Sequence, residues 1–87
     1  MSSDTIGLAE KIAKESIERG VRLVVDSARR RGESLVLVRE QGSRNVFLRL
    51  LIDNSKDYRI SGIEYIPDVF DTEFKGRKDP GYVLTLY

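Results

Sequence analysis

A helical repeat of apolar side chains runs through the first third of the chain and constrains the fold more than any other feature. At about 100° per residue, one apolar row covers roughly one third of the helical circle, and charged side chains occupy the opposite side. The row consists of Ile6, Ala9, Ala13, Ile17, Val21, Val24 and Ala28. Asp4 can cap the first turn, and Gly32 follows a basic last turn. We therefore expect an amphipathic helix from Asp4 to about Arg30.

Two features of this segment leave an alternative open. Gly20 interrupts the pattern, and a glycine inside a helix costs about 1 kcal/mol relative to alanine, so the helix could kink there. Residues 21–25, Val-Arg-Leu-Val-Val, are rich in β-branched side chains and also fit a strand. The helical phase continues unbroken across Gly20, and this favours the helix.

Beyond Ser34 the apolar side chains recur at the two-residue period of strands. We expect strands over residues 34–41, 46–53, 58–66 and 82–87. Short polar turns separate the first three, which should form an antiparallel meander because parallel strands need long crossovers. The sequence thus predicts an α+β fold in a single domain, residues 1–87. In this fold a long or kinked N-terminal helix packs on a four-stranded antiparallel sheet.

A second, narrower apolar row on the same helix consists of Leu8, Ile12 and Leu23. A continuous helix of this length would extend about 40 Å, whereas a strand of eight residues spans about 27 Å. A kink or a second subunit is needed to cover the overhang. Two interpretations stay open: a curved sheet buries both rows, or the second row binds another copy of the chain or a different protein.

The connection over residues 67–81 is long for a compact domain, and long loops are often binding elements. It carries Phe70 and Phe74, which are four residues apart. That spacing also fits one turn of a short helix that docks both rings into the core. The loop is therefore either structural or, together with the second helix row, part of a partner-binding surface.

Six arginines could form an electropositive stripe suited to phosphate groups: Arg29, Arg30, Arg31, Arg39, Arg44 and Arg49. Acidic residues interleave with them, and charge pairing between strands explains the pattern without a ligand. The net charge is only +1, whereas nucleic-acid-binding domains usually show a clear basic excess. Nucleic-acid binding is therefore the alternative function rather than the leading one.

The composition excludes several classes of function. The chain has no cysteine and no histidine, so it cannot assemble the usual transition-metal ligand sets or the Ser-His-Asp and Cys-His catalytic groups. No uninterrupted apolar run approaches the about 20 residues that span a bilayer, and the first residues lack the features of a signal peptide. We therefore expect a soluble, cytoplasmic protein-interaction module that is not an enzyme and uses no metal or cofactor. It should form a homodimer or bind another protein.

Overall fold

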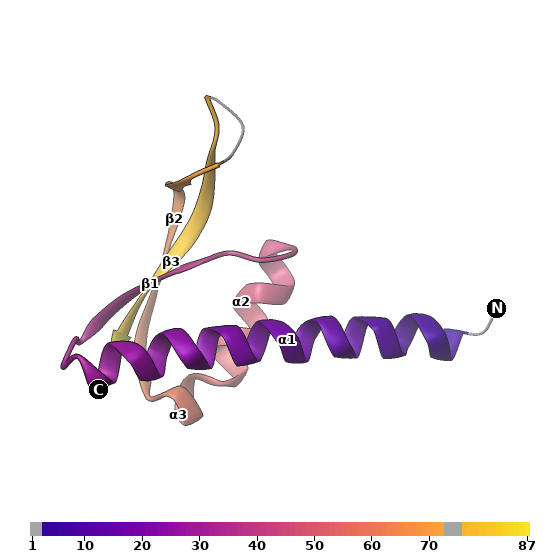
Figure 1. Ribbon diagram of the computed structural model, residues 1–87, viewed down its shortest axis with the longest axis horizontal. Helices are drawn as coiled ribbons and strands as arrows, with labels where there is room; N and C mark the ends of the chain where they lie inside the picture. The colour runs from indigo at the N-terminus through magenta and orange to yellow at the C-terminus, as the bar shows by residue number, and fades with distance from the viewer. Residues whose placement is uncertain (1–2, 73–75) are drawn as a thin grey trace.

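The computed structural model describes residues 3–72 and 76–87 of the chain and shows an α+β fold. A long N-terminal helix lies against a three-stranded antiparallel sheet, and two short helices connect the first two strands (Figure 1). In chain order the elements are α1 (Ser3–Arg30), β1 (Leu35–Arg39), α2 (Arg44–Asp53), α3 (Ser55–Tyr58), β2 (Ile60–Asp71) and β3 (Lys78–Leu86). The fold class and the long N-terminal helix are confirmed, whereas the prediction of four strands is wrong.

α1 is one helix of 28 residues that continues through Gly20. The alternative of a strand over residues 21–25 is therefore wrong. This segment is helical because its apolar side chains share one buried side of a helix. These side chains, at spacings of four and three residues, are Val21, Val25 and Ala28. Burial of this side selects the helical period over the strand preference of the β-branched side chains.

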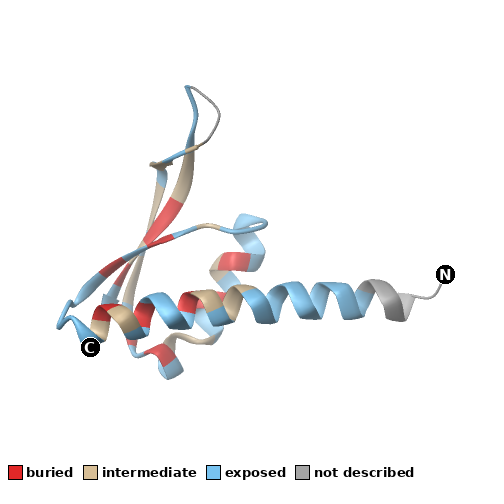
Figure 2. Ribbon diagram, viewed as in Figure 1, coloured by how far each residue is buried: buried red, intermediate tan, exposed pale blue. Residues whose placement is uncertain are grey.

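The sheet has the strand order β1-β3-β2, and both neighbouring pairs are antiparallel. The C-terminal strand is therefore central, and the predicted meander of consecutive strands is wrong. The core lies between one face of this sheet, the C-terminal half of α1 and the short helices (Figure 2). Its buried side chains are Val21, Val25, Ala28, Val36, Val38, Phe47, Leu50, Leu51, Tyr58, Ile60, Tyr82, Leu84 and Leu86.

The second predicted strand, residues 46–53, lies in helix α2, so that prediction is wrong. Phe47, Leu50 and Leu51 are buried together, and their spacing of three and four residues fits one face of a helix. The side chain of Ser43 caps the first turn. This segment therefore contributes a helical face to the core instead of a strand to the sheet.

The segment over residues 67–81 is mostly strand, and the prediction of a long loop is wrong. β2 extends beyond Pro67, and the two strands pair as a long antiparallel hairpin whose connection is only residues 72–77. Pro67 is tolerated because β2 is an edge strand and its pairing with β3 shifts register between Ile66 and Phe70. The irregular pairing thus allows β2 to continue beyond Pro67.

Candidate interaction surface

The N-terminal half of α1 projects beyond the rest of the chain (Figures 1 and 2). Every residue over 7–16 is exposed, and burial begins only at Ile17. Two large apolar side chains lie within residues 7–16: Leu8 is 58% exposed and Ile12 is 57% exposed. Half of the helix therefore presents apolar side chains to solvent.

The same apolar row continues on the half of α1 that packs against the core. Leu23 is 62% exposed, although Val21 and Val25 are buried. A step of two residues turns about 200° around a helix, so Leu23 points away from the core. Leu8 and Ile12 lie on this same side of the helix. We call these three residues, Leu8, Ile12 and Leu23, the outward face.

A groove of about 260 Å³ lies between α1 and β1, beside the outward face. Gly20 and Val24 line it from α1, and Leu37 lines it from β1. The groove is open beside Gly20, because a Cβ atom at this residue would meet no other atom within 4 Å. The groove thus extends the apolar surface of α1 towards the sheet.

Of the two phenylalanines predicted for the partner-binding surface, the structure describes one. Phe74 lies outside the described residues. Phe70 is half-buried in β2, and it lines the groove together with Val24. The guanidinium carbon of Arg39 lies 4.8 Å from the centroid of the Phe70 ring. The ring is therefore already in contact with other parts of its own chain.

The six arginines of the alternative function come from the C-terminal end of α1 and the residue that follows it, from β1 and from α2 (Figure 1). Five of them donate hydrogen bonds within the chain: Arg29 to the carbonyls of Tyr58, Arg59 and Tyr87, Arg30 to Ser27, Arg31 to Glu33, Arg39 to Asp79, and Arg44 to Tyr65. Arg49 and Lys14 line a pocket of about 370 Å³ between α2 and α1. The structure therefore distributes these side chains over several elements and gives most of them internal partners.

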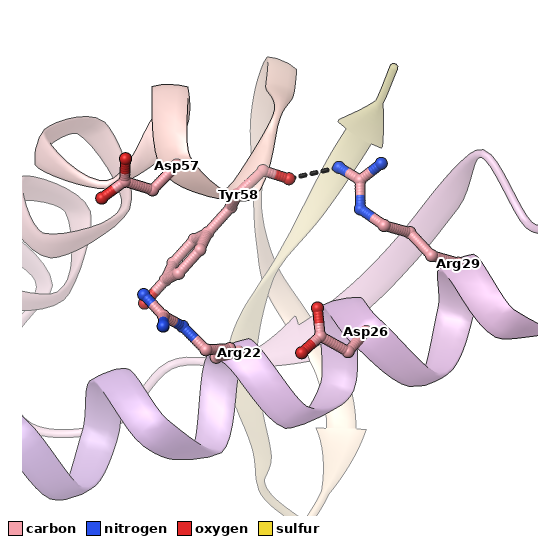
Figure 3. A pocket seen from close by; sticks show the side chains of 5 residues that line it. All are labelled: Arg22, Asp26, Arg29, Asp57 and Tyr58. Atoms are coloured by element: carbon pink, nitrogen blue, oxygen red, sulfur yellow. Dashed lines mark hydrogen bonds between the residues drawn. The ribbon is translucent and has the colours of Figure 1, made fainter.

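A polar pocket of about 380 Å³ lies where α1 meets α3 (Figure 3). It is lined by Arg22, Asp26, Arg29, Asp57 and Tyr58. Arg29 donates to the carbonyl of Tyr58, and Arg22 lies over the Tyr58 ring. Burial raises the pKa of the Tyr58 phenol. Two arginines and two aspartates balance one another here, so the pocket has no net charge that would attract an ion.

Sequence reasoning missed this pocket, although one signal was present. Arg22, Asp26 and Arg29 are spaced by four and three residues, which places them on one side of a helix. The other two lining residues come from α3, which the sequence did not predict as a helix.

In residues 3–72 and 76–87, no group of three or more Asp, Glu, His or Cys side chains is placed to hold a metal ion. No helix in the described part of the chain is long and apolar enough to cross a membrane. Comparison with protein-family models, with curated proteins and with solved structures finds no match for this chain.

Proposed function

We propose that this chain is a non-catalytic protein-interaction module whose outward face on α1 binds a second copy of the chain. The observation that carries this proposal is the projecting half of α1, in which Leu8 and Ile12 are both more than half exposed. Leu23 continues the face onto the half that packs against the core. Large apolar side chains that are exposed together, as Leu8 and Ile12 are, commonly mark a site of protein association.

Covering the projecting half of α1 would raise the stability of this part of the helix. A helical segment shorter than about 12–15 residues is marginal in water without tertiary packing, and residues 7–16 are all exposed. Full burial of a leucine or isoleucine side chain contributes about 1.5–3 kcal/mol. Covering the outward face would therefore stabilise the helix and bury its large apolar side chains together.

A second copy of the chain suits this surface for two reasons. Leu8 and Ile12 on the projecting half and Leu23 on the other half are similar aliphatic side chains, so one half can pack on the other half of a second molecule. The net charge is +1, so two copies repel each other only weakly. The face therefore fits a homodimer.

Sedimentation velocity over a wide concentration range tests this proposal. We expect the wild-type chain to dimerise as its concentration rises. The double variant Leu8→Gln/Ile12→Gln should stay monomeric, because amide groups replace the apolar side chains of the outward face. The control Glu10→Gln/Lys11→Gln also introduces two glutamines without changing the net charge, on other sides of the same turns, and should dimerise like the wild type.

Two results of this experiment would contradict the proposal. One is a wild-type chain that is monomeric at every concentration. The other is a Leu8→Gln/Ile12→Gln variant that dimerises as tightly as the control. Circular dichroism of both variants should show that each retains its fold.

Nucleic-acid binding is the alternative proposal, and Lys14 and Arg49 support it because they line one pocket. Titration with DNA and with RNA at about 50 and 200 mM salt tests it, since phosphate contacts lose affinity steeply with salt. A steep loss would support this alternative. The absence of binding at the lower salt concentration would remove it.

A further inference from the structure

One edge of β1 has no partner strand. Among the strands that the structure describes, only β3 pairs with β1. The residues that flank β1, Ser34 and Glu40, hydrogen-bond through their backbones to β3. In an antiparallel pair the backbone groups of successive residues alternate in direction, so the even-numbered residues of this segment face β3. Leu35, Leu37 and Arg39 therefore direct their N–H and C=O groups to the free edge.

The side chains along this edge alternate between buried and exposed. Val36 and Val38 are buried in the core, whereas Leu35 is 57% exposed and Leu37 is 40% exposed. An edge with unpaired backbone groups and apolar side chains is a template on which a further strand can form. β1 thus presents both the hydrogen-bonding groups and the side chains that recognise an extended peptide.

The groove between α1 and β1 lies beside this edge. Leu37 and Arg39 line it from the strand, and Gly20 and Val24 line it from the helix. The space beside Gly20 is open, and Val24 is 40% exposed. A strand added to β1 would therefore have an apolar site next to it for a side chain that points towards α1.

We propose that an extended peptide segment of a partner protein pairs with the free edge of β1 and places an apolar side chain in this groove. Antiparallel pairing is the more stable arrangement. The peptide side chains opposite Leu35 and Leu37 are apolar, because directly opposed side chains share a face and pack together. The peptide side chain opposite Arg39 is acidic, because Arg39 is the charged residue of the groove lining. Between these, the side chain opposite Val38 points to the other face and enters the groove.

A second copy of the chain fits this edge less well than a peptide does. α1 packs against β1, so two β1 strands paired edge to edge would bring both copies of α1 to the same seam. A peptide segment brings no helix with it. The proposal therefore goes beyond self-association through the outward face and does not depend on it.

Amide hydrogen exchange followed by NMR tests the pairing, with the peptide acetyl-Ser-Glu-Val-Leu-Thr-Leu-Lys-amide added in excess to the full chain. Exchange at the N–H groups of Leu35, Leu37 and Arg39 should slow by at least about tenfold, because each N–H gains a hydrogen bond. Exchange at Val36 and Val38, which already pair with β3, should change little.

N-methylated peptides show whether the backbone is recognised. Methylation of the two leucine amides should abolish binding, because these amides face β1 in the antiparallel pairing. Methylation of the valine and threonine amides is the matched control and should leave binding intact, because these amides point away from β1.

The variant Gly20→Leu tests the groove, because its side chain would occupy the space intended for the peptide. Fluorescence anisotropy with the labelled peptide should show binding weakened by at least about tenfold. The fold should persist, since a Cβ atom at Gly20 meets nothing within 4 Å and leucine favours a helix. Gly7→Leu is the control, because Gly7 is exposed in the same helix, away from the groove.

Three results would overturn the proposal. The first is unchanged exchange at the edge amides in excess peptide. The second is equal binding of the two methylated peptides, or equal binding by the two glycine variants. The third is protection of the edge amides that grows with protein concentration in the absence of peptide, because a second copy then occupies the edge. The Leu8→Gln/Ile12→Gln variant should bind the peptide like the wild type, so failure of the dimer leaves this proposal standing.

Discussion

The ring of Phe70 in β2 lies directly against the backbone of β3 at Gly81. A Cβ atom at Gly81 would lie 2.6 Å from Cε2 of Phe70 and 2.8 Å from the carbonyl oxygen of Val38. Three strands therefore meet at a point where only a hydrogen atom fits. This contact fixes how closely the β2–β3 hairpin approaches β1.

The variant Gly81→Ala should lower the free energy of unfolding by about 1–3 kcal/mol, as expected of overpacking. The carbonyl of Val38 belongs to a paired strand and cannot move aside easily. Urea unfolding measures the effect. Gly62→Ala is the control, because its Cβ would meet only the side chain of Thr85, at 3.2 Å. Equal losses in the two variants would contradict the prediction.

The variant Phe70→Ala should lower the free energy of unfolding by about 1–3 kcal/mol, because the half-buried ring loses its contacts with Gly81 and Arg39. Self-association should be unchanged under conditions in which the variant is folded. Urea unfolding and sedimentation velocity measure the two properties. A variant that keeps its stability but no longer dimerises would place Phe70 in the binding surface instead.

The variant Ser43→Ala should lower the free energy of unfolding by about 1 kcal/mol. The Ser43 hydroxyl accepts a hydrogen bond from the backbone N–H of Val46 at 3.3 Å, and this bond caps α2. Thermal unfolding followed by circular dichroism measures the loss. Ser34→Ala serves as the control, because Ser34 is exposed and lies outside the helices. If both variants melt at the same temperature, the cap contributes nothing.

The stability of the fold should fall at alkaline pH because of Tyr82. Tyr82 is buried, and its hydroxyl donates a hydrogen bond to the carboxylate of Glu40 at 2.5 Å. Burial, followed by this bond to a negative group, raises the pKa of Tyr82 above its usual value of about 10. Above that pH the unfolded chain ionises at Tyr82 while the folded chain stays protonated. The contribution of Tyr82 is therefore complete below about pH 10 and declines above it by up to about 1.4 kcal/mol per pH unit.

Urea unfolding between about pH 8 and pH 11 measures this decline. The variant Tyr82→Phe should show a shallower decline, because phenylalanine does not titrate and the contribution of Tyr58, whose pKa is also raised, remains. Tyr87→Phe is the control and should keep the wild-type decline, because Tyr87 is exposed. The same decline in the Tyr82→Phe variant and in the wild type would assign the effect to other groups.

Sequence periodicity identified α1 but failed for residues 46–53, and the reason lies in the residues themselves. The apolar side chains of α1 keep one helical phase for several turns, so no other period fits them as well. In α2 the shorter run satisfies two periods, because Leu48, Leu50 and Ile52 alternate while Phe47 and Leu50 share a helical face. Ser43 did not decide between the two periods, because a serine fits a helix N-cap and a turn equally well.

The outward face could be separated from the core side by sequence alone, because the angle between Leu23 and Val21 depends only on helical geometry. Whether a sheet would cover that face could not be predicted, because it depends on where the strands pack along α1. The groove at Gly20 could not be predicted for a similar reason. It needs Leu37 of β1 to lie beside α1, and this placement follows from tertiary packing.

One unbroken helix carries both the outward face and part of the core. Whatever fixes residues 7–16 in helical form also limits fraying towards Val21 and Val25. Under the proposed self-association, folding and assembly are therefore linked by mass action. The midpoint of thermal unfolding should therefore rise with protein concentration. Dilution should separate the two copies and lower the stability of each.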